Sequence, residues 1–249
     1  MKKITPVFIT LLMLGACKKN NTVQPASVPV KFTTTTYGFL GTYDGSGKPI
    51  NYLLPKDNIS PNLSSYVTST LPERKDLRTT HPELLTTQAI ADITMTKKSD
   101  VFITFVYQGT YIPDALAFYT YPTNNPPTTA ADIKNITYIF PYAGYTTTLQ
   151  PGDKVKIGTF DVGTSVGFVL MQGGWNTTTK TVDNSVVHFC SNDALNPEVD
   201  PKLKKHAVLI NYTPENKVLI GFEDLDRTDP KCDHDFNDVV VYATVTPSM

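Results

Sequence analysis

The sequence has few charged residues and no excess of positive charge. Lysine, arginine, aspartate and glutamate make up 18% of the 249 residues, and the formal net charge is −1. Because no basic stripe stands out, the composition argues against a nucleic-acid partner. Hydrophobic residues make up 40% of the chain, which is enough for a buried core in one large domain or two small ones.

Long hydrophobic runs are also missing. The apolar run within the first seventeen residues, MKKITPVFITLLMLGAC, is too short to span a bilayer as a permanent helix. Two lysines precede it, as in a secretory signal. The small residues before Cys17 resemble the lipobox of bacterial lipoproteins, which implies cleavage and lipidation at Cys17; an ordinary signal with an incidental cysteine is the alternative. We therefore predict a signal over 1–17 and a polar, flexible tether over 18–30.

Cysteine is scarce. Of the three in the chain, Cys190 and Cys232 would remain after export. An oxidising compartment favours a disulfide between them, with two free thiols as the alternative. A zinc site is a third interpretation, since His188 and His234 each lie two residues from one of these cysteines. That spacing, however, differs from the common zinc patterns.

No stretch predicts a helix of three turns, and no internal repeat is apparent. The segment LPERKDLRTTHPELL is broken by Pro72 and Pro82 and favours short helical turns. Before it, the turn signal DGSG at 44–47 separates two strand-like runs and predicts a hairpin. We treat 31–88 as an N-terminal β or irregular segment that packs on the main domain.

From about residue 89 the pattern is that of β-strands separated by turns. Val101, Ile103 and Phe105 alternate with other residues and should share one face of a strand. Further strand-like runs follow, including NITYIFPYA, KVKIGTF, SVGFVLMQGGW and HAVLINY. Their spacing predicts an all-β fold, an antiparallel β-sandwich resembling a jelly roll, over 89–249.

The last part of this domain, KVLIGFEDLDRTDPKCDHDFNDVVVYATV, is predicted to form two strands joined by an acidic loop. Alternation puts Ile220, Phe222 and Asp224 on one face of the first strand. If the second strand begins near residue 233, one of its faces carries Asp233, Asp235, Asn237, Val239 and Val241, and the other carries His234, Phe236, Asp238, Val240 and Tyr242. In an ordinary hairpin the carboxylates of the two strands would then meet at one end.

Converging carboxylate and amide oxygens form a site for a hard cation. Ca²⁺ accepts six to eight oxygens in irregular geometry, whereas Mg²⁺ requires a near-ideal octahedron. The segment lacks the glycine and the distant glutamate of an EF-hand, and a solvated acidic loop is the alternative. Asp226 and Asp229 fall in the loop between the strands and are left out. The predicted Ca²⁺ ligands are Glu223, Asp224, Asp233, Asp235, Asn237 and Asp238.

The same segment resembles the C-terminal signature of a bacterial family, the domain of unknown function 4114. Its hallmark is Gly-Phe-Glu-Asp, here at 221–224, followed by Asp-x-Asp-Phe-Asn-Asp, here at 233–238. The resemblance extends over about 70–247 and implies a β-rich domain in an exported protein, with calcium as a reasonable expectation. At an upstream strand pair the family usually has Asn and then Leu-Gly-Tyr-Tyr, where this chain has Asp114 and then LAFY at 116–119. The resemblance adds Asp114 to the predicted metal ligands.

Two other features bear on function. Trp175 is the only tryptophan and is flanked by glycines, so it could stack on a sugar, although such a residue is more often part of a core. Asp224 and Asp238 could form the carboxylate pair of a glycosidase. The sequence contains no nucleophile elbow, His-Glu-x-x-His motif or phosphate loop. We therefore predict that the protein is not an enzyme.

Together these features predict a lipid-anchored, calcium-binding β-sandwich of the cell envelope. Its anchor at Cys17 would hold it to the outer membrane, on either the periplasmic face or the surface. The predicted function is a binding or adhesion module for a glycan or a protein. The alternatives are a structural subunit of an envelope complex and a metal-dependent hydrolase.

Overall fold

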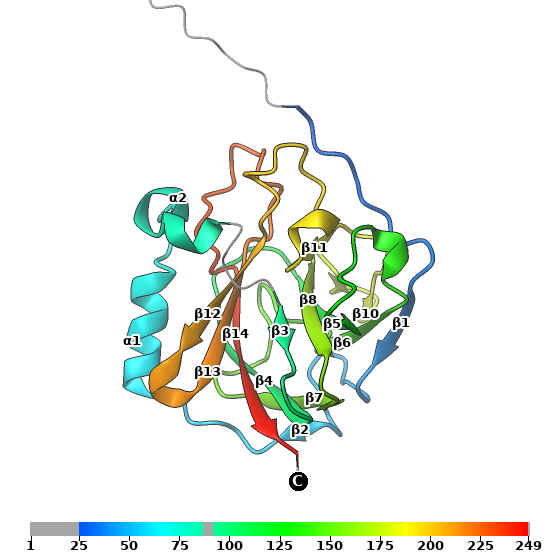
Figure 1. Ribbon diagram of the computed structural model, residues 1–249, viewed down its shortest axis with the longest axis vertical. Helices are drawn as coiled ribbons and strands as arrows, with labels where there is room; N and C mark the ends of the chain where they lie inside the picture. Colours follow the sequence, from blue (N-terminus) through cyan, green and yellow to red (C-terminus); the bar gives the residue numbers. More distant parts are fainter. Residues whose placement is uncertain (1–24, 87–91, 249) are drawn as a thin grey trace, which may run out of the picture.

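The computed structural model describes residues 25–86 and 92–248, which form an antiparallel-rich β-sandwich (Figure 1). The predicted all-β fold is thereby confirmed. The predicted signal sequence and Cys17 lie outside the described residues. Within the described ranges, the helices are all too short or too polar to cross a membrane.

The first sheet contains six strands, in the order β1-β6-β5-β8-β11, with β3 paired to β8. All of its pairs are antiparallel except β1 with β6, which is parallel. Its strands are β1 (Thr36–Phe39), β3 (Ile93–Thr94), β5 (Ala115–Pro122), β6 (Asn135–Phe140), β8 (Thr164–Met171) and β11 (His188–Cys190).

The second sheet also contains six strands, in the order β12-β13-β14-β4-β7-β2, and is antiparallel throughout. A two-stranded ribbon, β9 with β10, stands apart. The strands concerned are β2 (Leu53–Leu54), β4 (Ser99–Gln108), β7 (Lys154–Phe160), β9 (Trp175–Asn176), β10 (Thr181–Val182), β12 (Ala207–Tyr212), β13 (Lys217–Phe222) and β14 (Val239–Pro247).

The main hydrophobic core fills the space between the two sheets. Val101, Ile103 and Phe105 of β4 all point into it, as the alternation predicts. Phe168 of β8 meets them from the first sheet, and Phe222 of β13 joins the same cluster from their own sheet. Burial of these side chains from both sheets holds the sandwich together.

Each sheet is also covered on its outer face, which explains why β5 and β8 are apolar on both sides. A second cluster of buried residues, including Phe32, Ile133 and Leu195, covers the first sheet. A third cluster lies between the second sheet and α1 (Pro61–Thr70), which contributes Leu63 and Val67 (Figure 1).

Helix α1 is a finding that the sequence did not predict. Ser60 caps it by accepting a hydrogen bond from the Leu63 N–H, and Pro61 occupies its first position. The apolar residues of this helix are few, so its periodicity is weak. The short turns predicted further on are confirmed as α2 (Leu77–Thr80) and the 3₁₀ helix η1 (Pro82–Leu85).

The hairpin predicted around 44–47 is formed only at its tip, where the Asp44 N–H donates to the Lys48 carbonyl and the Ile50 N–H to the Thr42 carbonyl, both at 3.0 Å. The turn itself is present, but Tyr43 and Pro49 form only an isolated bridge. The flanking strands pair elsewhere, β1 with β6 and β2 with β7. The run before the turn therefore joins one sheet and the run after it joins the other.

Candidate cation site

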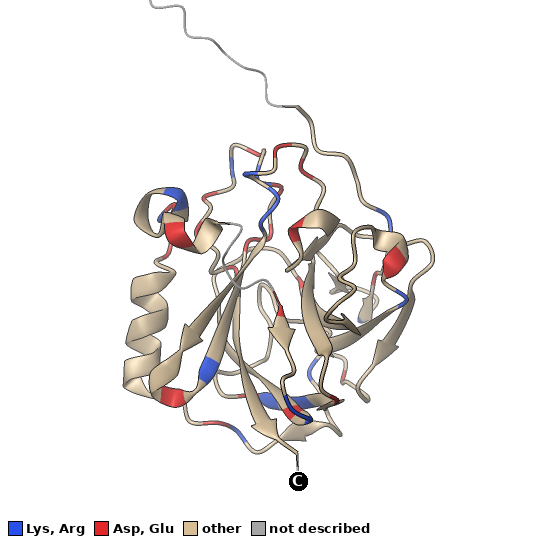
Figure 2. Ribbon diagram, in the orientation of Figure 1, with Lys and Arg blue, Asp and Glu red and all other residues tan. Residues whose placement is uncertain are grey.

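The acidic cluster lies where β13 ends, where β14 begins and where the loop between β4 and β5 passes them. The predicted hairpin is confirmed, with Phe222 paired to Val239. Beyond that pair, the Asp224 N–H donates to an Asp238 carboxylate oxygen at 2.8 Å, and the Gly109 N–H donates to the Asp238 carbonyl at 3.1 Å. Figure 2 shows acidic residues along the loop between β13 and β14, whereas the strands themselves are mostly uncharged.

The prediction that 233–238 is regular strand is wrong, and so is the assignment of its side chains to alternating faces. Strand β14 begins at Val239, and both His234 and Phe236 have left-handed backbones, with φ of 60° and 58°. Non-glycine residues seldom adopt this conformation. The segment is thus a tightly turned loop, and its carboxylates converge by turning rather than by strand alternation.

Gly221 permits this loop to lie against β13. A Cβ at this position would be 2.4 Å from the Phe236 carbonyl oxygen and 2.6 Å from Leu71 Cδ1. No side chain larger than hydrogen fits without a shift of backbone. Phe236 itself is completely buried in the third cluster, which holds the loop in place.

Glu223 is the common member of two groups of oxygen donors. It converges with Asp233 and Asp235 in one group, and with Asp224 and Asp238 in the other, with ligand atoms within 4.8 Å of one another in each. Glu223 is only 1% exposed, whereas Asp233 is exposed at the edge of the site. Glu223 therefore lies between two groups of carboxylates, and the group with Asp233 opens towards solvent.

Asp114, in the loop before β5, lies beside Asp224, and burial and then the charge of Asp224 raise its pKa. Its Oδ1 accepts a hydrogen bond from the Gly173 N–H at 2.8 Å, and its Oδ2, although buried, has no donor. Glu223 Oε2 is likewise buried without a donor. Two buried carboxylate oxygens without donors are costly in the absence of a positive partner. A bound cation would satisfy both, so the donor set fits a hard cation such as Ca²⁺.

Neighbouring segments fix the orientation of the other predicted ligands. Asp235 accepts hydrogen bonds from the N–H groups of Arg74 and Asn237, at 2.7 and 3.1 Å. The Asn237 side-chain amide donates to the Leu71 carbonyl at 3.2 Å, which leaves its oxygen available as a ligand. The Thr110 hydroxyl donates to the Asp224 carboxylate. The segment after α1 therefore helps to build the site.

Crowding and burial raise the carboxyl pKa values throughout the cluster. Burial, followed by the neighbouring acidic groups, raises the pKa of Glu223 to about 8. Burial raises the pKa of Asp235 to about 6. For Asp114 and Asp238, burial and then the charge of Asp224 raise the pKa well above the usual range. In the absence of a cation, these groups are therefore held partly protonated.

A third group combines Glu223 with Cys232 and His234, and it has a different chemistry. The Arg227 Nε–H donates to His234 Nδ1 at 3.2 Å, and Cys232 Sγ lies 3.1 Å from the same nitrogen. The nitrogen that would bind zinc therefore accepts a hydrogen bond from a cation. His188 does not join this group, because its ring nitrogens bond to Tyr37 and to the Val186 carbonyl. The predicted zinc site, in which His188 and His234 would act together with the two cysteines, is therefore not formed.

Two further sequence predictions do not agree with the structure. Cys190 and Cys232 are both free and buried, so the predicted disulfide between them is not formed. Trp175 is 1% exposed and stacks on Tyr142 with a centroid separation of 5.6 Å. It is a core residue and is not available as a sugar-stacking platform.

Of the seven predicted ligands, Asp114 lies beside Asp224 and Asn237 lies in the acidic loop, and the two donor groups contain the other five, Glu223, Asp224, Asp233, Asp235 and Asp238. Asp226 and Asp229, which were left out, accept hydrogen bonds within their own turns and lie outside the donor groups. What the sequence missed is the supporting pair of Arg74 and Thr110. These residues come from loops without a periodic pattern, so only the fold reveals their position.

Comparison with known proteins supports the resemblance seen in the acidic signature. Residues 160–246 match the model of a family described as a domain of unknown function, DUF4114. The match includes β8, β13, β14 and the loop with Glu223, but not Asp114. Neither the curated proteins nor the solved structures contain a match to this chain.

Proposed function

We propose that the chain is a calcium-binding β-sandwich in which the cation fixes the C-terminal hairpin. The observation that carries this proposal is the position of Glu223, buried between two groups of carboxylates with Oε2 lacking a donor. Five carboxylates repel one another when ionised, and a divalent cation at their centre would offset that repulsion. Oxygen donors in a loop of irregular geometry favour Ca²⁺ over Mg²⁺.

Calcium should stabilise the fold, since the unfolded chain cannot present these ligands together. With free calcium at 100 times the dissociation constant, the gain in unfolding free energy is about 2.7 kcal/mol. For a domain of this size that corresponds to a rise of about 5–10 °C in melting temperature. The test is thermal unfolding in EDTA, in millimolar Ca²⁺ and in millimolar Mg²⁺. Equal melting temperatures in EDTA and Ca²⁺ would refute the proposal.

We further propose that this end of the molecule binds a ligand at the cell envelope, with the protein anchored through Cys17. The support is a set of exposed aromatic rings beside the cation site. Tyr111 is 72% exposed, Tyr145 is 45% exposed, and their centroids are 5.7 Å apart. Arg74 links them to the site, as its Nη2 contacts the Tyr111 hydroxyl and its N–H bonds to Asp235. Exposed rings with polar neighbours suit a glycan.

A glycan array in calcium tests this ligand class, and Tyr111→Ala should abolish any signal without lowering the melting temperature. If the array shows no binding and a protein is instead recovered stably from membranes, the chain is a subunit of an envelope complex.

A further inference from the structure

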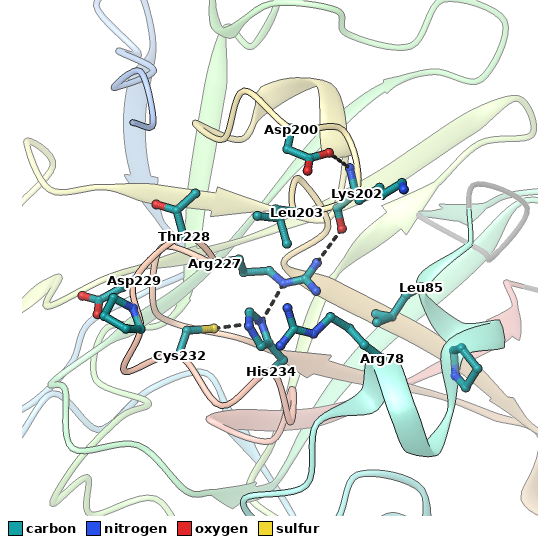
Figure 3. A pocket seen from close by; sticks show the side chains of 12 residues that line it. Arg78, Leu85, Asp200, Lys202, Leu203, Arg227, Thr228, Asp229, Cys232 and His234 are labelled. Carbon is teal, nitrogen blue, oxygen red and sulfur yellow. Dashed lines mark hydrogen bonds between the residues drawn. The ribbon is translucent and has the colours of Figure 1, made fainter. Parts of the chain in front are cut away.

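A pocket on the other side of the acidic loop contains a buried arginine that the cation site does not use. The pocket has a volume of about 670 Å³ and lies between the α2–η1 segment and the loops around 200 and 230 (Figure 3). Arg227 lines it and is only 2% exposed. A pocket of this size accommodates a small organic ligand.

Part of the Arg227 guanidinium is committed to the protein. Its Nε–H donates to His234, and Nη1 donates to the Lys205 carbonyl at 3.0 Å. Nη2, by contrast, is buried without an acceptor. Among the described residues, Arg227 forms no ion pair with a carboxylate. A buried guanidinium with a vacant donor and no paired anion is costly unless a further acceptor is supplied.

Two more cations face the same pocket. Arg78 lies near Arg227, and its charge adds to burial in lowering the Arg227 pKa, while Cys232 and Glu223 act in the opposite direction. The Arg78 Nε and Nη2 groups donate to the Asp76 carboxylate, at 2.9 and 2.7 Å, so Nη1 is the part of this guanidinium that a ligand could use. Lys202 also lines the pocket, and no ion pair involves it within the described part of the chain. The nearby carboxylates are already engaged by backbone N–H groups, Asp200 with Lys202 and Asp229 with Lys231, both at 2.9 Å.

The remaining lining is partly apolar. Leu203 is buried in the wall, and Leu85 and Pro82 of η1 lie at its edge. The pocket therefore combines guanidinium donors with a hydrophobic surface. Guanidinium groups bind carboxylate, phosphate and sulfate oxygens through paired N–H donors.

We infer that this pocket binds a small organic molecule through an oxyanion group, which accepts hydrogen bonds from Arg227 Nη2 and from Arg78 Nη1, beside the Arg78–Asp76 ion pair. The ligand class is a phosphate ester, a sulfate ester or a carboxylate, with an apolar part against Leu203. The inference stands on the pocket alone and does not require calcium at Glu223.

The test is thermal unfolding with inorganic phosphate, sulfate and succinate, each titrated against chloride at constant ionic strength. EDTA is present throughout, so that neither calcium binding nor calcium phosphate affects the result. We expect a saturable rise in melting temperature with at least one of these probes, and the effective probe identifies the oxyanion. A failure here leaves the calcium proposal intact, because that proposal is tested without these anions.

Variants locate the effect. Arg78→Gln and Lys202→Gln should each weaken the dissociation constant of the effective probe at least tenfold. Arg78→Gln keeps the backbone N–H that donates to the Asp76 cap of α2 but loses the side-chain ion pair with Asp76, so its melting temperature without any probe is measured as well. Lys180→Gln, at an exposed lysine outside the pocket, is the charge-matched control and should change it less than twofold.

Arg227→Lys retains the charge but removes Nη2, so it should also lose binding of the effective probe. If this variant does not fold, Arg78→Gln and Lys202→Gln test the inference. A rise that does not saturate, no rise with any probe, or equal weakening by Lys180→Gln would overturn the inference.

Discussion

Glu223 belongs to both groups of carboxylates. A substitution of Glu223 therefore distinguishes stabilisation by a bound cation from the effect of the acidic residues on stability when no cation is bound. Glu223 is buried, lacks a donor to Oε2, and is surrounded by like charges. In EDTA, Glu223→Gln should unfold at the same temperature as the wild type or higher, because a neutral amide replaces a buried carboxyl group that is costly to ionise there. In calcium, the variant should lose the stabilisation that the wild type gains.

The expected weakening of calcium binding by Glu223→Gln is at least about a hundredfold, since residues that merely orient metal ligands already contribute about 10–100-fold. Isothermal titration calorimetry measures it. Asp229→Asn is the matched control, as Asp229 lies on the same loop but outside the donor groups. If both variants bind calcium alike, Glu223 is not a ligand.

His188 gives a residue-scale prediction that is independent of any metal. Its ring stacks on Phe32 at 4.6 Å, its Nδ1–H donates to the Val186 carbonyl, and its Nε2 accepts from the Tyr37 hydroxyl. Burial lowers its pKa from 6.5 to about 4. A depressed histidine pKa contributes stability that is complete above pH 6.5 and is lost as the pH falls towards 4.

Between pH 7 and pH 5 the wild type should therefore lose about 2 kcal/mol more unfolding free energy than His188→Gln. Denaturant unfolding of both proteins at the two pH values measures the difference. The comparison cancels the other titrating groups, which the proteins share. An equal loss in both proteins would show that His188 is not held neutral by its surroundings.

At the scale of elements, the site depends on how closely the acidic loop lies against β13. Gly221→Ala would place a methyl group against the Phe236 carbonyl oxygen. We expect a loss of about 1–3 kcal/mol of unfolding free energy, as for other overpacked positions, and weaker calcium binding because the loop must move. Gly38→Ala in β1 is the control, since its Cβ would meet nothing within 4 Å. Equal stability of the two variants in chemical denaturation would contradict this account.

Elements whose pattern is local were predictable from sequence, and those that depend on packing were not. The alternation of Val101, Ile103 and Phe105 identified β4 and its buried face, because a strand with one core face repeats every second residue. The helix over 61–70 escaped notice, as its few apolar residues carry little periodicity. Its position is determined by the outer face of the second sheet, which no local pattern records.

In the candidate site, too, the sequence predicted the residues but not their arrangement in space. The carboxylates were identifiable because their density at a strand end is unusual. Their geometry was not, since the left-handed turns at His234 and Phe236 replace the strand that the alternation indicated. Asp114 was included through family resemblance alone, and its position beside Asp224 depends on the loop before β5.

At the scale of the whole molecule, the loop between β13 and β14 separates two regions of opposite charge. One side carries the carboxylates around Glu223, and the other carries the pocket with Arg78 and Arg227. Arg227 links the two through His234 and Cys232. Both regions depend on the same loop, so a cation that fixes this loop would also fix one wall of the pocket.

The central claim is that a calcium ion occupies the centre defined by Glu223. X-ray diffraction from crystals grown with CaCl₂, recorded for the anomalous signal of calcium, tests it most directly. We predict one anomalous peak at about 2.3–2.6 Å from Glu223 Oε2 and from oxygens of at least three of the other predicted ligands. The absence of a peak there, or a peak only elsewhere on the surface, would contradict the account.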